Sequence, residues 1–503
     1  MAEEGERVGI LVVSYGSRAA AVLEALSRSE EYNARFFVVD KQRNPFNLRH
    51  AAGKGTAVGK GTAEKGNHVV IPDLDAGKIC EFVAANKDEI DFGICCPEKP
   101  IISGVRDLVE SETGVPLLCP TRRFALEGSK AWQRRLLAEC CPEANPRFEV
   151  FRRSDYTTRE EAKRAVWRFL DEVGDEVAVK PDKPAAGKGV GVWGDHFTSR
   201  GQLFEHFWSI FEGGSGVVVE EKLEGEESSF QAFCDGKRLA ALPDTRDYKR
   251  AFDGDLGQNT GGMGSYKDSK DWLPFLEKRD REEEERLVQK IFKRLRGSEE
   301  QSRGEWQSER RNDGAGLRGV PFYVAFMHTA EGAKILEINS RPGDPELQTV
   351  LPVLKSDFVD LCFRMLEGRL TRVECEAKAT VVTYAVPLDY GGCRAKYSGD
   401  RRVDLSAAYA LQAKEKYGDR LRVYPGSLEL REDGQTYALG SRTVCTVGVG
   451  ETVEEAREIS LDGVRNIDGA LWNRWDIGSE QHLRRSVRRM RALRGAKERE
   501  INA

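Results

Sequence analysis

The chain has 503 residues, which is more than one hydrophobic core usually organises, so we expect about three domains or more. Its 78 lysines and arginines nearly balance 83 aspartates and glutamates, for a net charge of −5, which argues against a chain-wide electrostatic dependence on nucleic acid or on an anionic membrane. No apolar run reaches the about 18 residues that a membrane span needs, and the acidic start of the chain does not resemble a secretory signal.

Strand-like and helix-like segments alternate in the first part of the chain. Apolar strands are predicted over 8–13, 34–39 and 91–95, and helices over 19–26 and 102–109. Short apolar strands that alternate with helices indicate a parallel sheet with helices on its faces. The Gly- and Lys-rich segment 52–66 interrupts this alternation, and we expect it to be a mobile loop.

The later parts of the chain are also predicted to contain both helices and strands. A helix is expected from Ser129, with strands over 176–180, 217–221, 228–234 and 323–327. Further strands are expected over 380–386 and 444–449, followed by a helix from Thr452.

Two segments are expected to be peripheral. The segment 297–318 is polar, Gly-rich and poor in apolar residues, which predicts a disordered insertion. The tail from Gln481 is rich in arginine, with Leu483, Val487, Met490 and Leu493 spaced for one helix face. An amphipathic helix packed on its own domain is favoured there over a basic helix that contacts nucleic acid.

The strongest chemical signal is the stretch ILEINSRPGDPELQ at 335–348. Alternation along the predicted strand places Glu337 and Asn339 on the same face, where a carboxylate and an amide oxygen can bind a hard cation such as Mg²⁺. Arg341 and Asp344 follow in a loop that contains glycine and proline. A solvent-facing strand end is the alternative for a lone E-x-N, but the complete run favours the metal site.

A second signal follows the strand that ends at Lys180. The loop after it, PDKPAAGKGV at 181–190, contains Lys188 and glycines whose backbone amides can hold phosphates. It is not a G-x-x-x-x-G-K-[ST] loop, because Val190 offers no hydroxyl for Mg²⁺. An ordinary turn with surface lysines is equally consistent with this segment alone.

Two further segments suit a nucleotide site. The run 217–227 is an apolar strand followed by an acidic linker, whose backbone could pair with adenine and whose Glu227 could hold ribose hydroxyls. The sequence DGDLGQNTGGMG at 253–264 has glycines that allow a loop to press against a ligand. A solvated acidic turn and a flexible surface loop are the respective alternatives.

Together these motifs resemble the phosphoribosylamine–glycine ligases, which are ATP-grasp ligases of purine synthesis. The matching stretches follow the family's order over about 8–478: DFGICCPEKPIISGV, LLCPTRRFALEGSKAW, VAVKPDKPAAGKGV, VVVEEKLEGEESSF, RDYKRAFDGDLGQNTGGMGSY and ILEINSRPGDPELQ. The resemblance implies a multidomain α/β and α+β fold built around an ATP-grasp core. The implied units are an N-terminal parallel-sheet (pre-ATP-grasp) domain over 1–119, an ATP-grasp domain over 120–370 with a lid over about 130–218, a C-terminal α+β domain over 371–480 and a basic tail over 481–503.

The resemblance also implies a reaction and a set of site residues. ATP would drive the joining of glycine to 5-phosphoribosylamine through glycyl phosphate, with ADP and phosphate released. Mg²⁺ or Mn²⁺ is implied at Glu337 and Asn339, and catalytic roles are implied for Arg341 (the anchor of the glycine carboxylate), Lys188 and Asp247. The residues implied at ATP are Lys180, Ala186, Gly187, Lys188, Gly189, Glu220, Glu221, Leu223 and Glu227. Those implied at the other substrates are Gly16, Arg18, Asn44, Glu98, Arg341 and Asp344.

Several stretches depart from the family pattern where the amine substrate is expected. The family's GSGGREHAL is SYGSRAAAV at 14–22, its PGNAGT is RNPFN at 43–47, and its Gly-Pro-Glu is Cys-Pro-Glu at 96–98. Ala325 stands where some relatives offer a metal-binding glutamine. Two alternatives therefore stay open beside the glycine ligase: an ATP-grasp ligase with a different amine, and a non-catalytic nucleotide-binding module.

The expected partners are small-molecule substrates, and neither nucleic acid nor a membrane is expected to bind. The eleven cysteines contain no C-x-x-C pair, so buried free thiols are expected rather than a zinc ribbon. A reducing cytoplasm is then the simplest compartment. The chain is expected to be a monomer or a small homo-oligomer.

Overall fold

The first part of the chain forms a parallel sheet that is covered on both faces. A computed structural model of the chain describes residues 5–52, 67–184, 189–301, 315–394, 396–413 and 416–501. Its N-terminal sheet has the order β3-β2-β1-β4-β5 and comprises β1 (Glu6–Val13), β2 (Tyr32–Asp40), β3 (His68–Val70), β4 (Phe92–Cys95) and β5 (Leu117–Leu118). Along β1, Ile10 packs into one core cluster and Leu11 into another, as expected for a strand buried on both sides. The predicted parallel sheet and its strands are confirmed.

Helices cover this sheet, and one of them differs from the prediction. They are α1 (Ser17–Ser27), α2 (Pro45–Ala52), α3 (Ala76–Asn86), α4 (Glu98–Ile102) and α5 (Val105–Thr113). A single helix over 102–109 was wrong: Gly104 between α4 and α5 has φ 85°, a left-handed conformation that interrupts the helix. The loop predicted over 52–66 lies outside the described residues, apart from Ala52.

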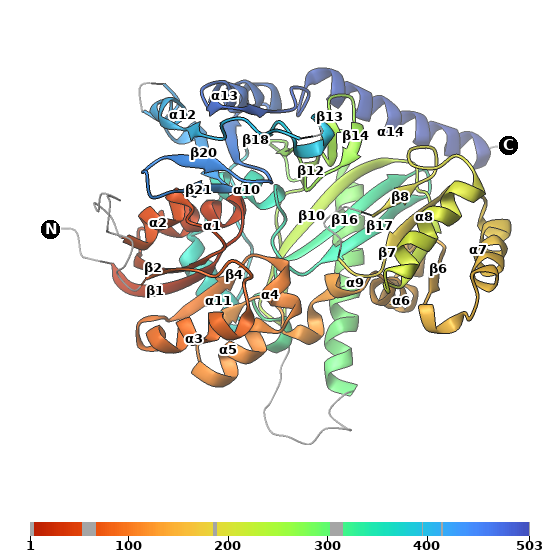
Figure 1. Cartoon of the computed structure of the whole chain (residues 1–503), viewed down its shortest axis with the longest axis horizontal. Coiled ribbons are helices and arrows are strands. Elements are labelled where there is room, and N and C mark those ends of the chain that lie inside the picture. Colours follow the sequence, from red (N-terminus) through yellow and green to blue (C-terminus); the bar gives the residue numbers. More distant parts are fainter. Residues whose placement is uncertain are drawn as a thin grey trace.

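A second sheet, the side sheet, stands at the right of Figure 1. It is antiparallel with the order β6-β9-β7-β8, from β6 (Phe148–Phe151), β7 (Val177–Pro181), β8 (Gly191–Val192) and β9 (Val217–Glu221). Helices α7 (Arg159–Val173) and α8 (Arg200–Glu212) pack on it through an aromatic core that includes Phe151 and Phe207. The strands predicted over 176–180 and 217–221 are confirmed.

The central sheet has the order β11-β10-β16-β17 and is antiparallel. Its strands are β10 (Glu226–Cys234), β11 (Leu239–Ala241), β16 (Phe322–Thr329) and β17 (Gly332–Asn339). Two helices, α6 (Lys130–Cys140) and α9 (Lys278–Gln301), pack against one face, where Val324 and Ile338 share a core with Leu137 and Ile291. The opposite face of β17 is therefore available for polar side chains. After β17 come α10 (Glu346–Val350) and α11 (Phe358–Glu367).

The C-terminal sheet combines strands from distant parts of the sequence. Its order is β12-β15-β18-β23-β20 with β25 beside β18, from β12 (Arg246–Asp247), β15 (Gly264–Lys267), β18 (Ala379–Pro387), β20 (Leu421–Pro425), β23 (Val444–Gly450) and β25 (Leu471–Trp472). Smaller elements complete this part: the pairs β13 (Arg250–Phe252) with β14 (Leu256–Asn259), β19 (Val403–Asp404) with β24 (Asp468–Gly469) and β21 (Leu428–Leu430) with β22 (Thr436–Ala438), and the helices α12 (Ser406–Ala410) and α13 (Val453–Arg465). The strands β12 and β15 precede residue 370, and the other strands of this sheet follow it. The sheet therefore joins the predicted C-terminal domain to the part of the chain before it.

The two segments predicted to be peripheral have different outcomes. The tail forms α14 (Glu480–Ile501), which lies across the top of the molecule in Figure 1, with Met490 2% exposed against the core. The amphipathic helix is confirmed, but packing on its own domain is only part of the outcome, because its arginines pair with Asp255 and Asp280, outside the 371–480 region that precedes the tail. The disordered insertion over 297–318 was wrong at both ends, because α9 continues to Gln301 and Leu317 is fully buried. Its middle part, 302–314, lies outside the described residues.

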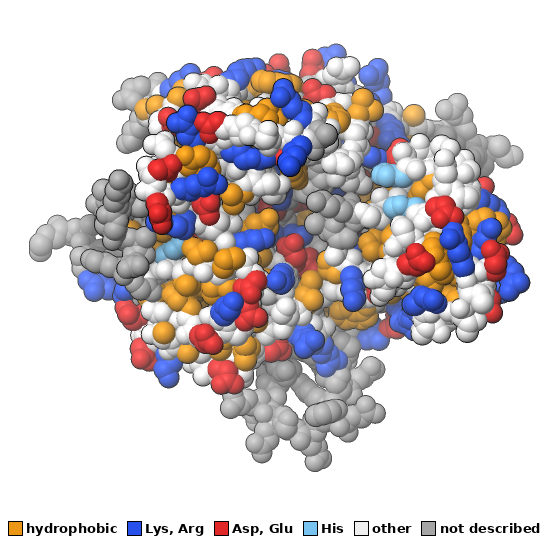
Figure 2. Space-filling model, viewed as in Figure 1, with side chains coloured by type: hydrophobic (Ala, Val, Ile, Leu, Met, Phe, Trp, Pro, Cys, Tyr) orange, Lys and Arg blue, Asp and Glu red, His pale blue; other side chains and the backbone are white. Residues whose placement is uncertain are grey.

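The surface view locates the concave part of the molecule. Figure 2 shows a hollow between the side sheet at the right and the rest of the molecule, with acidic and basic side chains gathered in it. Among the helices that the structure describes, none has the length and apolar composition of a membrane span.

Candidate functional site

The end of β17 presents Glu337 and Asn339 on one face of the central sheet. In register, Ala325 of β16 faces Glu337 and Tyr323 faces Asn339. A β-bulge before Glu337 allows Ile335 to reach the core cluster on the other face together with Ile338, although the two are three residues apart. Burial opposes ionisation of Glu337, but the charges of Lys130, Lys180, Lys249 and Arg341 hold its pKa below the usual value.

Side chains of α6 occupy the free edge of β17. Gln133 donates through Nε2 to the carbonyl of Ile338 (2.8 Å) and accepts from its amide through Oε1 (2.9 Å). Arg134 donates to the carbonyls of Ile335 (2.9 Å) and Leu336 (2.7 Å). Backbone groups at a sheet edge need such partners when they are buried, so α6 fixes the strand that carries the predicted metal ligands.

Arg134 also joins the central sheet to the side sheet. Its guanidinium makes a two-point ion pair with Glu220 of β9, with Nε–Oε2 at 2.7 Å and Nη2–Oε1 at 3.1 Å. Glu220 pairs in turn with Lys180 of β7, and all three side chains are largely buried. Burial lowers the pKa of Lys180, and Arg134 adds to this effect against the opposing charge of Glu220. The carboxylate of Glu220 is thus occupied by two cations at the end of the side sheet.

The remaining residues predicted at ATP lie around the link between β9 and β10. Glu221 is tied to Arg147, whose Nε is 2.9 Å from its Oε2, and Leu223 is half-buried in the link. Glu227 pairs with Lys249 at 2.5 Å, and despite burial this lysine holds the pKa of Glu227 below its usual value. Of the predicted phosphate loop, Ala186, Gly187 and Lys188 lie outside the described residues. Gly189 is described, and its carbonyl oxygen lies 3.0 Å from His206 Nε2.

Asp247 of β12 carries a carboxylate oxygen, Oδ1, that has no hydrogen-bond partner among the described residues. Burial and the neighbouring Glu346 raise the pKa of Asp247 well above its usual value, against the opposing charge of Lys249. Gly262 must lack a side chain here, because a Cβ would stand 2.6 Å from this Oδ1 and the residue has φ 100°. The glycine-rich loop therefore does press closely on Asp247.

Arg341 lies between two carboxylates. Its Nε is 3.1 Å from Oε2 of Glu127 and 3.5 Å from Oε2 of Glu98. Burial disfavours the charged form of Arg341. The negative charges of Glu127 and Glu98 outweigh this effect and raise the pKa of Arg341 above its ordinary value. The structure thus brings together Arg341 and Glu98, two residues predicted at the substrates, although they are far apart in sequence.

Asp344 is held by groups from three other segments. Its Oδ1 accepts from the Tyr384 hydroxyl (2.7 Å) and from Gln348 Nε2 (2.8 Å), and its Oδ2 lies 3.0 Å from Arg442 Nη2. Tyr384 also hydrogen-bonds to Ser17 at the start of α1. Burial works against ionisation, but Arg442 and other donors hold the pKa of Asp344 below its usual value.

The three remaining predicted substrate residues have different surroundings. Gly16, with φ 78°, is close to Asp344, because a Cβ on it would be 3.3 Å from Oδ2. Arg18 is 2% exposed and donates to the carbonyl of Pro342, so it supports the 341–344 loop. The Asn44 amide nitrogen donates to the carbonyls of Pro425 and Gly426, and its oxygen accepts from the first backbone amides of α2. These contacts give no support to a substrate contact by the Asn44 side chain.

Several residues at this site were missed in the sequence. Glu127 and Lys130 lie in the LEGSK stretch, which was recognised only as part of a longer match, and Ser129 between them caps α6 by accepting from the Trp132 amide. Charged residues on both sides of a helix cap were a usable signal. No comparable local signal pointed to Tyr384 or Arg442, which reach the site through the C-terminal sheet.

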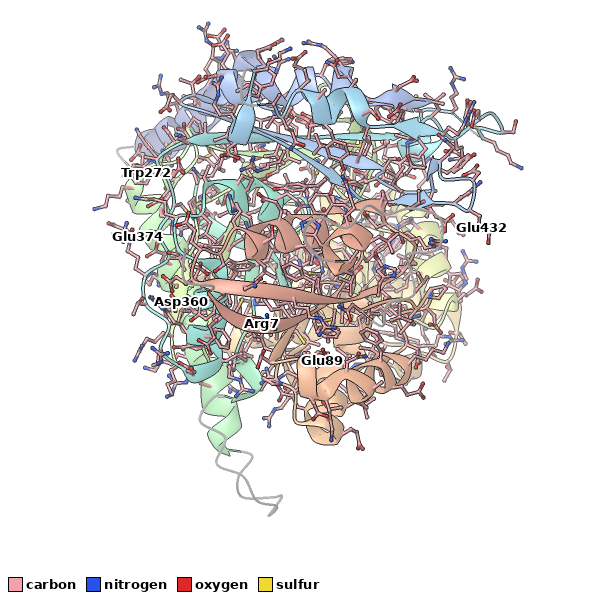
Figure 3. The ribbon with its side chains drawn as sticks, turned by 90° about the vertical axis from the view of Figure 1, so that its left-hand side faces the viewer. Arg7, Glu89, Trp272, Asp360, Glu374 and Glu432 are labelled. Atoms are coloured by element: carbon pink, nitrogen blue, oxygen red, sulfur yellow. The ribbon has the colours of Figure 1, made fainter. Side chains whose placement is uncertain are left out.

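A separate cavity of about 730 Å³ lies away from these residues, between β11 and the segment 370–375. Arg238, Arg281 and Arg372 line it together with acidic and apolar residues, so it has no consistent charge. Glu374, one of its lining residues, lies on the flank of the molecule in Figure 3, on the same side as Trp272. None of the predicted site residues lines this cavity.

Comparison with known proteins agrees with the geometry. Residues 128–347 match the family model described as phosphoribosylglycinamide synthetase, ATP-grasp (A) domain. The phosphoribosylamine–glycine ligase of Methanocella arvoryzae is 34% identical over 489 residues, which cover 97% of this chain and 100% of that protein, and the Pyrococcus furiosus protein of the same name is 31% identical over 490 residues, with coverage of 97% and 98%. The crystal structure of phosphoribosylamine–glycine ligase from Thermotoga maritima has the same fold, with a TM-score of 0.66 at 22% identity, and covers 93% of this chain and 100% of that chain. The chain belongs to the phosphoribosylamine–glycine ligase family, with an ATP-grasp fold.

Proposed function

We propose that the chain uses ATP to join glycine to 5-phosphoribosylamine, which gives glycinamide ribonucleotide, ADP and phosphate for purine biosynthesis. The full-length similarity to ligases of this name supports the proposal. The structural observation that carries it is the end of β17, where the oxygen donors Glu337 and Asn339 are followed directly in the next loop by the carboxylate-binding candidate Arg341. One short segment can thus hold the phosphate donor and the carboxylate acceptor of the first step.

Two transfers complete the reaction. In the first, a carboxylate oxygen of glycine attacks the γ-phosphorus of ATP, and the bond from that phosphorus to the β,γ-bridging oxygen breaks to release ADP. In the second, the nitrogen of phosphoribosylamine attacks the acyl carbon of glycyl phosphate, phosphate leaves, and the nitrogen loses a proton. No protein nucleophile is needed, so catalysis rests on positioning and charge neutralisation.

The residues at the end of β17 fit a divalent cation. Glu337 is kept ionised by the cations around it, and Asn339 supplies a neutral oxygen on the same strand face. Both are hard oxygen donors, which suit Mg²⁺ or Mn²⁺ and leave positions for phosphate oxygens and water. A bound cation of this kind neutralises charge on the triphosphate.

The nucleotide is proposed to lie between the side sheet and the central sheet. Lys180 and Lys188 would meet the phosphates, and the loop 185–189 would act as part of a lid, within the unit over about 130–218. Glu220, Glu221, Leu223 and Glu227 border the link between β9 and β10, which suits the nucleoside. Closure of such a lid would exclude water from the labile acyl phosphate.

The amine substrate is proposed to lie on the side of Arg341 away from the nucleotide, at the carboxyl ends of β1 and β4. Gly16 and Glu98 follow these two strands, and open parallel sheets bind ligands at this edge. Asp344 lies beside Gly16, and this proximity supports a role for its carboxylate in orienting the amine or the sugar. Asp247, with its unpartnered carboxylate oxygen, is a second candidate for the amine.

We further propose a cytoplasmic location and a monomer or small homo-oligomer. The cysteines support a reducing compartment, because all eleven are free thiols and most are buried. The tail helix α14 uses Arg485 and Arg494 to pair with acidic residues of its own chain, which supports a structural role rather than nucleic-acid binding.

The proposal is tested by ADP release with the amine varied. Purified protein with Mg·ATP and glycine should release ADP rapidly when freshly made 5-phosphoribosylamine is added, and mass spectrometry should identify glycinamide ribonucleotide. Omission of either glycine or the amine should remove product formation. Full activity with a different amine, and none with phosphoribosylamine, would contradict the proposal and favour the alternative ligase.

A further inference from the structure

Glu127 is held firmly beside Arg341 by the segments around it. It lies in the short helical turn η3 (Leu126–Gly128), directly before α6. The amide of Leu126 donates to Ser340 Oγ (3.0 Å), and its carbonyl accepts from Gln133 Nε2 (2.9 Å). This turn is therefore fastened both to the loop after β17 and to the helix that fixes β17.

The two oxygens of Glu127 have different surroundings. Oε2 lies 3.1 Å from Arg341 Nε. Oε1 has no hydrogen-bond partner among the described residues, although the side chain is only 4% exposed. A buried carboxylate oxygen without a donor costs free energy, so it calls for an explanation such as a donor on a ligand. Glu98, the other carboxylate at Arg341, is 36% exposed in its side chain and can be solvated.

The charges around Arg341 favour a ligand that is itself neutral overall. Three guanidinium groups, Arg18, Arg341 and Arg442, lie among three carboxylates, Glu98, Glu127 and Asp344. A free α-amino acid is a zwitterion, with a carboxylate and an ammonium separated by one carbon. Arg341 and Glu127 are in direct contact, so they present opposite charges at the short spacing that a zwitterion requires.

We propose that Glu127 binds the α-ammonium group of the amino-acid substrate through Oε1, while Arg341 binds its carboxylate. This inference rests on the proposed function, because it assigns the second half of the glycine subsite. An ammonium group donates to Oε1 and so supplies the partner that this oxygen lacks. Glu127 is thereby a specificity-determining residue: it selects a substrate that carries a positive charge next to its carboxylate.

The test compares glycine with glycolate, in which a hydroxyl replaces the ammonium group. Binding of each is measured by calorimetry in the presence of Mg²⁺ and a non-hydrolysable ATP analogue. Because a hydrogen bond between two charged groups is worth more than a neutral one, wild-type protein should bind glycine at least about tenfold more tightly than glycolate. Equal affinities would overturn the inference, and this measurement does not depend on the folding of any variant.

The variant Glu127→Gln removes the charge and keeps the shape. Glycine affinity should fall about 10- to 100-fold, while glycolate affinity should change by less than about threefold. If Glu127 served only to orient Arg341, both ligands would lose affinity equally, because both carry the carboxylate, and the inference would be overturned. An unchanged glycine affinity would overturn it as well.

Two controls sharpen the comparison. Glu139→Gln removes an exposed carboxylate of α6 that pairs with Arg294 (2.6 Å), and it should leave both affinities unchanged. Arg341→Gln should weaken glycine and glycolate alike. Absence of glycine-dependent ADP release from wild-type protein would contradict the proposed function and this inference together. Glycine-dependent release with an intact preference for glycine in Glu127→Gln would contradict this inference alone.

Discussion

At the scale of single residues, Arg341 shows how the site keeps a charge in place. Burial disfavours the guanidinium, but Glu127 and Glu98 raise its pKa, so Arg341 stays charged across the physiological range. The two carboxylates lie at its Nε, at 3.1 and 3.5 Å. A planar fork of donors can bind a substrate carboxylate at two points, which a lysine cannot do.

The substitution Arg341→Lys therefore keeps the charge and removes the fork. We expect the KM for glycine to rise about 30-fold or more, with the affinity for Mg·ATP changed by less than about threefold. Steady-state ADP release and nucleotide titration measure the two quantities. An unchanged KM for glycine would show that Arg341 does not bind the carboxylate.

Because of Glu127, we expect the free energy of unfolding of the glycine-free protein to depend on pH. Burial, opposed by Arg341, raises the pKa of Glu127 from 4.5 to about 7. An acid with a raised pKa binds its proton more tightly in the folded state, so it contributes stability that is complete below about pH 4.5 and is lost as the pH rises through about 7. At pH 8 the ionised group then makes the folded state less stable by about 3 kcal/mol at most.

Removal of this carboxyl by Glu127→Gln should abolish that loss. Denaturant unfolding at pH 5 and pH 8 should show a larger gain in unfolding free energy for the variant at pH 8 than at pH 5. Since other titrating groups are common to both proteins, the difference between them isolates Glu127. A difference that does not vary with pH would mean that Glu127 has no raised pKa.

At the scale of elements, the position of β17 depends on α6. Among the described residues, no further strand lies beside the edge of β17, and Gln133 and Arg134 take the place of one. Arg134 also reaches Glu220, so one helix links the strand with the proposed metal ligands to the side sheet.

Loss of Arg134 should therefore disturb both sheets. Arg134→Gln leaves Glu220 with one cation fewer and uncovers the carbonyls of β17, and we expect a loss of about 3–5 kcal/mol in unfolding free energy. Arg135→Gln on the exposed face of the same helix is the matched control, with an expected change within about 0.5 kcal/mol. Equal unfolding free energies of the two variants would show that Arg134 does not stabilise the contact between β17 and the side sheet.

A second element-level prediction concerns β18. Tyr384→Phe removes the hydroxyl that donates to Asp344, while the ring can keep its place in the core. If Asp344 orients the amine, the KM for phosphoribosylamine should rise about tenfold and the KM for glycine should stay within about threefold. Tyr409→Phe, which removes a hydroxyl that accepts from Arg49 elsewhere, is the control. A rise in both KM values would indicate a general loss of structure.

The sequence predicted what depends on local pattern, and it missed what depends on distant contacts. Alternation and apolar runs located β1 and β9, and the motif around Glu337 located the strand end. The break at Gly104 was missed because the apolar pattern continues through it. Tyr384 was missed because it lies on β18, forty residues after Asp344. Only the packing of the C-terminal sheet against the loop after β17 brings the two side chains together, and no local pattern encodes that packing.

At the scale of the whole molecule, the site is assembled from the N-terminal, central and C-terminal parts of the chain. The loop after β17 touches α1 through Arg18, α4 through Glu98 and the segment just before β23 of the C-terminal sheet through Arg442. Arg442 also donates to the carbonyls of Gly261 and Asp344, so it fastens the glycine-rich loop to the loop after β17. The C-terminal sheet is thus part of the site's architecture and not a separate attachment.

We propose that glycine is activated by direct phosphorylation of its carboxylate. Glycine labelled with ¹⁸O in the carboxylate tests this most directly, in a reaction with unlabelled ATP, 5-phosphoribosylamine and the wild-type protein. One labelled oxygen should appear in the inorganic phosphate for each ADP formed, because the oxygen that attacks the γ-phosphorus leaves with it. Phosphate that carries no label, formed together with glycinamide ribonucleotide, would contradict phosphorylation of the glycine carboxylate.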